Sequence, residues 1–125
     1  MPDSQTFHSK VQGKTLIVMP SGSVSSLAGQ YFKPELDDLL GRLNRPELKN
    51  VVLDLANVSY FGTIMLGTMH QLWKSVRDGG GKMALCNVST VGREILRVSG
   101  VDTIWPVYSS PKEALDAVEE EEPGP

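Results

Sequence analysis

Asp54 ends an apolar stretch that begins at residue 51, a position where a carboxylate could be chemically active. General acid–base chemistry or metal binding by a carboxylate requires a second acid or a histidine at a suitable spacing. The sequence offers no identifiable partner for Asp54. We therefore expect its carboxylate to accept structural hydrogen bonds rather than to take part in catalysis.

The two histidines and the single cysteine form no recognisable catalytic or metal-binding set. His8 and His70 are far apart in the sequence, and Lys74, one helical turn after His70, is not a second ligand. Cys86 ends an apolar stretch, where a thiol is typically an inert core residue, and one cysteine excludes an internal disulfide. The sequence thus predicts no catalytic residue, no metal site and no cofactor, and we expect a protein that is not an enzyme.

The run Gly79-Gly80-Gly81-Lys82 invites comparison with a phosphate-binding loop. That motif needs two spaced glycines, then Lys and Ser or Thr, at the start of a helix. Here Met83 follows the lysine, and the glycines precede a strand. A helix cap followed by a turn is therefore the favoured interpretation.

The elements that would position these residues alternate between strand and helix. Apolar patterning and turn residues predict strands at residues 7–11, 15–19, 51–55, 82–86 and 103–108. The first two are close enough to form an antiparallel hairpin, and the third is typical of a central parallel strand buried on both faces. The predicted fold class is α/β, with a four- to five-stranded mixed sheet and about four helices.

The four helices are recognised by their apolar spacing and their ends. The first begins near Lys33 with Pro34 in its first turn, and the second carries Met65, Met69, Leu72 and Val76 on one face. The third carries Val91, Ile95 and Val98. The fourth opens on an N-cap serine with Pro111 next and Glu113 at the third helical position, and its Leu115 and Val118 are expected to face inward.

The length and charge of the chain exclude further classes of protein. The chain has 125 residues and a net charge of −3, and without the run Glu119 to Glu122 its basic residues would outnumber the acids by one. A near-neutral body argues against a nucleic-acid binder, and no apolar run is long enough for direct membrane insertion. We expect a cytoplasmic protein with a disordered N-terminus at 1–5, a single domain at 6–118 and an acidic disordered tail at 119–125.

Three stretches carry a resemblance to a known family: NVVLDLANVSYFGTIMLGTM, GGKMALCNV and VGREILRVSGVDTIWPVYSSPKEAL. Together they resemble the STAS domain of anti-sigma-factor antagonists, which implies a STAS fold for residues 6–118. The resemblance implies a binding module in signal transduction and transcription regulation in bacteria. Such modules dock on a switch kinase that restrains a sigma factor, and phosphorylation of a Ser or Thr releases them.

The phosphorylation motif departs from the family. Its usual form is roughly Asp-Ser-Ser/Thr-Gly at the start of the helix after the central strand, and the aligned residues here are Gly62, Thr63, Ile64 and Met65. Ile64 stands at the acceptor position and has no hydroxyl. Thr63 is the remaining candidate phospho-acceptor in the motif, and Ser59 lies just upstream.

The resemblance leaves three interpretations open. The first is a partner-binding domain that is not phosphorylated at the usual site, the second is a switch shifted to Thr63 or Ser59, and the third is a scaffold or regulatory subunit of a larger signalling or transporter-associated assembly. The expected partner is an anti-sigma-factor switch kinase, to which any ATP would belong. The predicted contact residues are Ser59, Tyr60, Phe61, Gly62, Thr63 and Ile64, flanked by Ser23 and Asn87.

Overall fold

Strands and helices alternate along the chain in a computed structural model that describes residues 7–20, 33–58 and 63–120. The strands are β1 (Phe7–Gln12), β2 (Thr15–Pro20), β3 (Asn50–Asp54), β4 (Met83–Cys86) and β5 (Val107–Tyr108). The helices are α1 (Lys33–Leu43), α2 (Thr63–Asp78), α3 (Thr90–Val98) and α4 (Pro111–Glu119), with a short 3-10 helix, η3 (Val101–Thr103), before β5. The predicted disordered segment 1–5 and residues 121–125 of the predicted tail at 119–125 lie outside the described residues.

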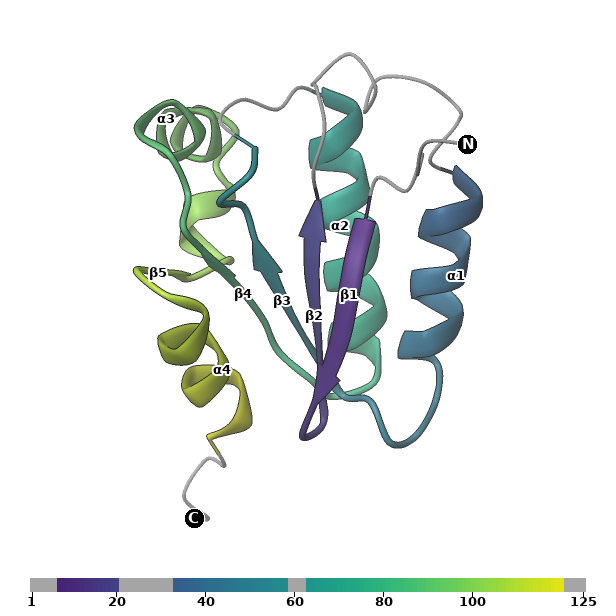
Figure 1. Ribbon diagram of the computed structural model, residues 1–125. Coiled ribbons are helices and arrows are strands. Elements are labelled where there is room, and N and C mark those ends of the chain that lie inside the picture. The colour runs from purple at the N-terminus through teal and green to yellow at the C-terminus, as the bar shows by residue number, and fades with distance from the viewer. Residues whose placement is uncertain (1–6, 21–32, 59–62, 121–125) are drawn as a thin grey trace, which may run out of the picture.

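The strands form one sheet in the order β1-β2-β3-β4-β5 (Figure 1). β1 and β2 are the expected antiparallel hairpin, whereas β2, β3, β4 and β5 pair in parallel. Parallel neighbours must be joined by crossovers, and helices provide them here. The α/β class, the mixed sheet and the α-helices are therefore confirmed.

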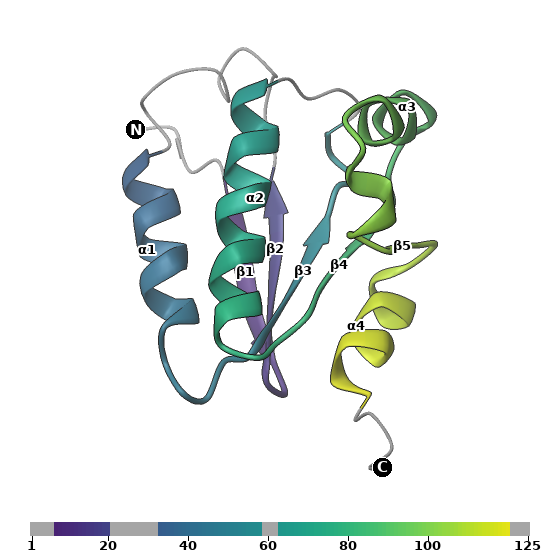
Figure 2. The same cartoon turned by 180° about the vertical axis from the view of Figure 1, so that it is seen from behind.

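Both faces of the sheet are covered, so successive residues of the central strands enter two different cores. One face packs beneath α1 and α2, and the other packs against α4 (Figures 1 and 2). The strand residues in the first core are Leu16, Val18, Val51, Leu53, Met83 and Leu85. Those in the second are Ile17, Val52, Ala84 and Cys86.

The predicted helix ends agree with the structure. The Ser110 hydroxyl accepts a hydrogen bond from the Glu113 N–H at 3.2 Å, so Ser110 is the N-cap of α4. At the end of α2, Gly80 has a left-handed φ of +81°, and the Gly81 N–H donates to the Val76 carbonyl at 2.7 Å. These contacts satisfy backbone groups that a helix end leaves unpaired, as a glycine cap does.

The predicted strand over 103–108 is shorter in the structure. Gly100 has a φ of +78° and redirects the chain into η3, after which Ile104 and Trp105 both donate their N–H to the Val101 carbonyl. Trp105 is fully buried in the larger core. Residues 103–105 are thus held by a local turn and a buried indole, and only Val107–Tyr108 pair with β4.

The apolar residues of α3 do not all face the core. Gly92 and Leu96 are buried, whereas Val91 is 53% exposed and Val98 is 72% exposed. Ile95 is half-buried. The spacing that marks this helix in the sequence therefore describes a face that is largely open to solvent.

The structure also corrects the start of the acidic tail. Glu119 is the last residue of α4, and its carboxylate accepts hydrogen bonds from the Lys14 N–H at 3.0 Å and from the Thr15 hydroxyl. Gly13, in the same hairpin turn, has a φ of +62°, and a Cβ there would lie 2.7 Å from a Glu119 carboxylate oxygen. Glu119 thus fastens α4 to the β1–β2 turn.

We expect Gly13→Ala to lower the free energy of unfolding by about 1–2 kcal/mol, because an L side chain is strained at this φ. The added methyl group would also displace the Glu119 carboxylate. Urea unfolding followed by tryptophan fluorescence measures the change.

Gly41→Ala is the matched control, because Gly41 lies in α1 with nothing near its would-be Cβ. This variant should gain about 0.5–1 kcal/mol through helix propensity. Equal effects of the two substitutions would contradict the role assigned to the hairpin turn.

Candidate functional site

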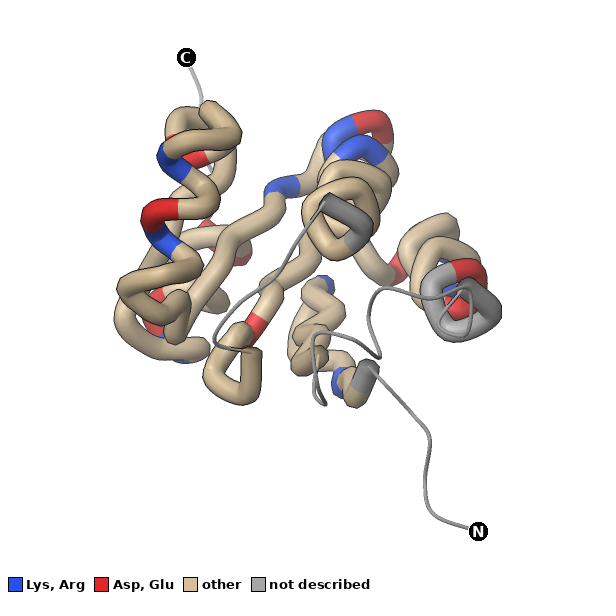
Figure 3. The backbone as a smooth tube through the Cα atoms, turned by 90° about the horizontal axis from the view of Figure 1, so that it is seen from above, with Lys and Arg blue, Asp and Glu red and all other residues tan. Residues whose placement is uncertain are grey.

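The carboxyl ends of β2, β3 and β4 meet at one edge of the sheet, the upper edge in Figure 1 and the one that faces the viewer in Figure 3. The predicted contact residues follow these strands. Of them, Ser23, Ser59, Tyr60, Phe61 and Gly62 lie outside the described residues, as do the side chains of Thr63 and Ile64. The structure therefore describes the framework of the predicted site, the start of α2 and Asn87.

The framework includes the N-terminus of α2, which begins at Thr63. The first N–H groups of a helix have no partner within the helix, and the helix dipole adds partial positive charge there. The first turn carries no acidic residue. Met65, at the position where the family has glycine, is only 2% exposed and belongs to the larger core. The first turn of α2 is thus built into the core.

Asp54 closes β3 at this edge and is buried. Its Oδ1 accepts a hydrogen bond from the Ala56 N–H at 3.1 Å and another from the Asn87 Nδ2 at 3.0 Å. A bond from a carboxylate to the N–H two residues later shapes the turn that follows a strand. The structural role predicted for Asp54 is confirmed.

Asn87 joins three strands at the same edge. It follows β4, its amide donates to Asp54 at the end of β3, and its N–H donates to the Tyr108 carbonyl of β5 at 3.3 Å. Its φ of +57° lies in the left-handed region, which asparagine tolerates better than most residues. Asn87 is half-buried, and its first role is to position the edge.

Cys86 lies next to this bridge but is not a reactive thiol. Burial raises the pKa of its thiol to about 12, and the charge of Asp54 adds to the effect. A thiol with such a pKa is almost entirely protonated near neutral pH, and the thiolate is the reactive form. This agrees with the expected inert core cysteine.

His70 is half-buried on α2 in an aromatic cluster rather than in a polar site. Its ring packs edge-on against Trp105 at 4.8 Å and against Trp73 at 6.1 Å, between ring centroids. The Arg77 guanidinium lies 4.7 Å from the Trp73 ring centroid.

In the part of the chain that the structure describes, no group of three His, Cys, Asp or Glu residues could hold a metal ion. Over the same residues, no helix has the length and apolar character to cross a membrane.

The exposed face of α3, formed by Val91 and Val98, is a candidate contact surface that the sequence analysis missed. The helix starts beside Asn87, with Ser89 as its N-cap, so it begins at the carboxyl edge of the sheet (Figure 1). The periodic spacing of apolar residues was visible in the sequence. Spacing alone does not distinguish an apolar face that is covered from one that is open.

We expect Asp54→Ala to lower the free energy of unfolding by about 1–3 kcal/mol, because it removes the acceptor of two part-buried hydrogen bonds, those from the Ala56 N–H and the Asn87 amide. Asp54→Asn keeps an acceptor oxygen and should cost less. Asn87→Gly removes the amide but retains the left-handed backbone.

Urea unfolding of the variants, alone and combined, measures the coupling between the two side chains. The double variant Asp54→Ala with Asn87→Gly should cost less than the sum of the two single substitutions. Additive losses would show that the Asp54–Asn87 bond contributes nothing to the edge.

This chain is similar to known proteins in both sequence and structure. The family model of the STAS domain matches residues 6–114. The chain is 28% identical over 104 residues to the anti-sigma F factor antagonist of Paenibacillus polymyxa. The aligned part covers 83% of this chain and 86% of that protein. It is 30% identical over 108 residues to BtrV of Bordetella bronchiseptica, a protein assigned by name to the anti-sigma factor antagonists, over 86% of this chain and 89% of that one.

A solved structure shows the same fold. The crystal structure of TM1081 from Thermotoga maritima matches with a TM-score of 0.76 at 24% identity, over 94% of this chain and 97% of that chain. Its strands and helices therefore follow the arrangement described above. With a family match that spans nearly all of the described residues, this chain belongs to the STAS domain family.

Proposed function

We propose that this chain is a non-enzymatic regulatory module of the anti-sigma-factor antagonist type, which binds a protein partner at the carboxyl edge of its sheet. The observation that carries the proposal is the match, along most of the chain, to two relatives that bear the antagonist name. The partner we infer is an anti-sigma-factor switch kinase, which would supply any ATP.

The chemistry of the edge supports binding rather than catalysis. The Asp54 carboxylate is engaged by two donors, and the raised pKa of the Cys86 thiol keeps it protonated. Among the residues that the structure describes, this edge offers a partner a fixed strand end and the apolar Val91 and Val98 side chains. Apolar side chains at the centre of an interface contribute to binding when a partner removes them from water.

We also propose that the usual phosphorylation switch is absent. Ile64, at the acceptor position, has no hydroxyl to phosphorylate. Met65 replaces a glycine and is part of the core, so this turn differs from the family in packing as well as in chemistry. Binding would then be constitutive or regulated elsewhere, and the alternative is a switch shifted to Thr63 or Ser59.

Incubation with ATP and the switch kinase proposed as the partner, followed by intact-mass and peptide mass spectrometry, tests the switch. We expect no phosphate on the wild type and a stable complex. Ile64→Ser should gain phosphate, because it restores a hydroxyl at a helix N-terminus, where a phosphate is stabilised.

Thr63→Ala is the control for the shifted switch. Stoichiometric phosphate on wild-type Thr63, lost in this variant, would replace the proposal with a switch that has moved by one residue. Phosphate on Ser59 would do the same.

The contact surface has its own test. Val91→Asp and Val98→Asp should each weaken binding of the kinase about tenfold or more, because a charge would be buried in the interface. Val11 is the matched control, since it is 56% exposed on β1 and an apolar-to-acid change there makes the same chemical substitution.

Calorimetry on purified proteins gives the dissociation constants. An equal loss for Val11→Asp would indicate that α3 is not the contact surface. A wild-type protein recovered from cells only in a large assembly would favour the scaffold interpretation.

A further inference from the structure

A lysine comes immediately before each of three neighbouring parallel strands. Lys14 precedes β2, Lys49 precedes β3 and Lys82 comes directly before Met83, the first residue of β4. The strands are in register here, with Thr15 opposite Asn50. The three lysines therefore lie along one edge of the sheet, at the amino ends of the strands and opposite the candidate partner surface.

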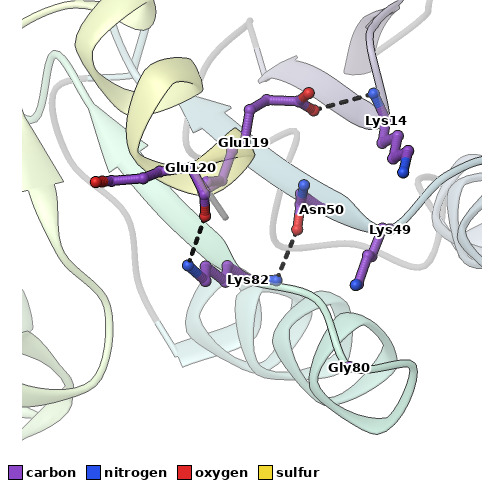
Figure 4. A pocket seen from close by; sticks show the side chains of 8 residues that line it. Lys14, Lys49, Asn50, Gly80, Lys82, Glu119 and Glu120 are labelled. Atoms are coloured by element: carbon purple, nitrogen blue, oxygen red, sulfur yellow. Dashed lines mark hydrogen bonds between the residues drawn. The ribbon is translucent and has the colours of Figure 1, made fainter. Parts of the chain in front are cut away.

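These lysines line a cavity of about 520 Å³, together with the C-terminal end of α4 (Figure 4). A second cavity of about 600 Å³ adjoins it, shares Lys14 and Lys49, and adds Arg45. Cavities of this size accommodate small-molecule ligands. Three cationic residues thus line each cavity, and Lys14 and Lys49 line both.

Buried, hydrogen-bonded polar groups lie at the base of the first cavity. The Asn50 Oδ1 accepts a hydrogen bond from the Lys82 N–H at 2.9 Å, and its Nδ2 donates to the Thr15 hydroxyl at 3.4 Å. Thr15 and Asn50 are both buried. The Thr15 hydroxyl also donates to Glu119, so the lysine-bearing backbone of three strands and the end of α4 are held together.

None of the four cationic side chains forms an ion pair with a carboxylate among the described residues. The Lys82 ammonium donates to a neutral acceptor, the Glu120 carbonyl, at 3.1 Å. The carboxylates nearby are engaged or turned away: Asp78 pairs with Arg77, Glu119 accepts from the hairpin turn, and the Glu120 carboxylate extends away from the other labelled side chains in Figure 4. A chain with a net charge of −3 therefore gathers four cationic residues at this edge, where the acidic residues Asp78, Glu119 and Glu120 also line the two cavities.

We propose that this edge binds a small anion bearing two or more phosphate groups, held chiefly by Lys14 and Lys49, which line both cavities. An ammonium is a compact point charge that suits phosphate oxygens. Helices α1, α2 and α4 end at this edge, and their dipoles attract cations with about half a charge each. That attraction explains why lysines are tolerated here, but it leaves the Lys14 and Lys49 ammonium groups free to bind an anion.

Inorganic pyrophosphate is the probe, titrated into the full chain by calorimetry at constant ionic strength with chloride as the balancing anion. Backbone NMR shifts should change at residues 14, 49 and 82, and the thermal unfolding midpoint should rise. The double variant Lys14→Gln with Lys49→Gln should bind about tenfold more weakly or worse, whereas Lys14→Arg with Lys49→Arg should retain most of the affinity.

The control is Lys10→Gln with Lys74→Gln, which changes the net charge equally at exposed positions outside both cavities. Equal losses of pyrophosphate affinity in the two double variants would show that net charge alone explains the binding, and would overturn the proposed site. No wild-type binding at millimolar pyrophosphate would also overturn it. If that double variant fails to fold, the single substitutions provide the same comparison.

Discussion

The structure depends on one short strand that is buried on both faces and polar only at its ends. β3 begins at Asn50 and ends at Asp54, and the three residues between them are apolar and fully buried. Because both faces are covered, no polar side chain could be accommodated within the strand without a partner. The layers follow from this strand, since its successive residues must enter separate cores beneath α1 and α2 and against α4.

The two polar ends of β3 each accept a hydrogen bond from a group next to β4, at opposite edges of the sheet. Asn50 accepts a hydrogen bond from the N–H that precedes β4, and Asp54 accepts one from the amide of the residue that follows β4. Each end therefore fixes the position of the neighbouring strand at the point where loops begin. Buried polar groups that are fully bonded specify a unique geometry, and the residues near both ends of the sheet are held in place in this way.

Much of this arrangement could be predicted because the signals are local. The apolar run of β3, the Ser110 cap and the glycine stop of α2 each show themselves within a few residues of sequence. Glu119 could not be recognised in this way, since its partner Lys14 is 105 residues distant and the neighbouring glutamates suggested a solvated tail. The 3-10 turn before β5 depends on the left-handed Gly100 and on a core that receives Trp105, and neither is visible in a strand-like pattern.

The formal charge of −3 describes neither edge of this molecule. At the carboxyl edge, Asp54 is buried and bonded and the first turn of α2 has no acid, and among the described residues the exposed apolar face of α3 is the contact surface that we propose. At the amino edge the cations lack carboxylate partners, although Glu119 lies beside them, because that carboxylate is bound to the hairpin turn. Salt screens a charged surface and leaves apolar contact largely unaffected. One small sheet thus presents two different surfaces, one mainly apolar and one charged, and the run of glutamates that sets the net charge begins with Glu119 and Glu120 at the amino edge.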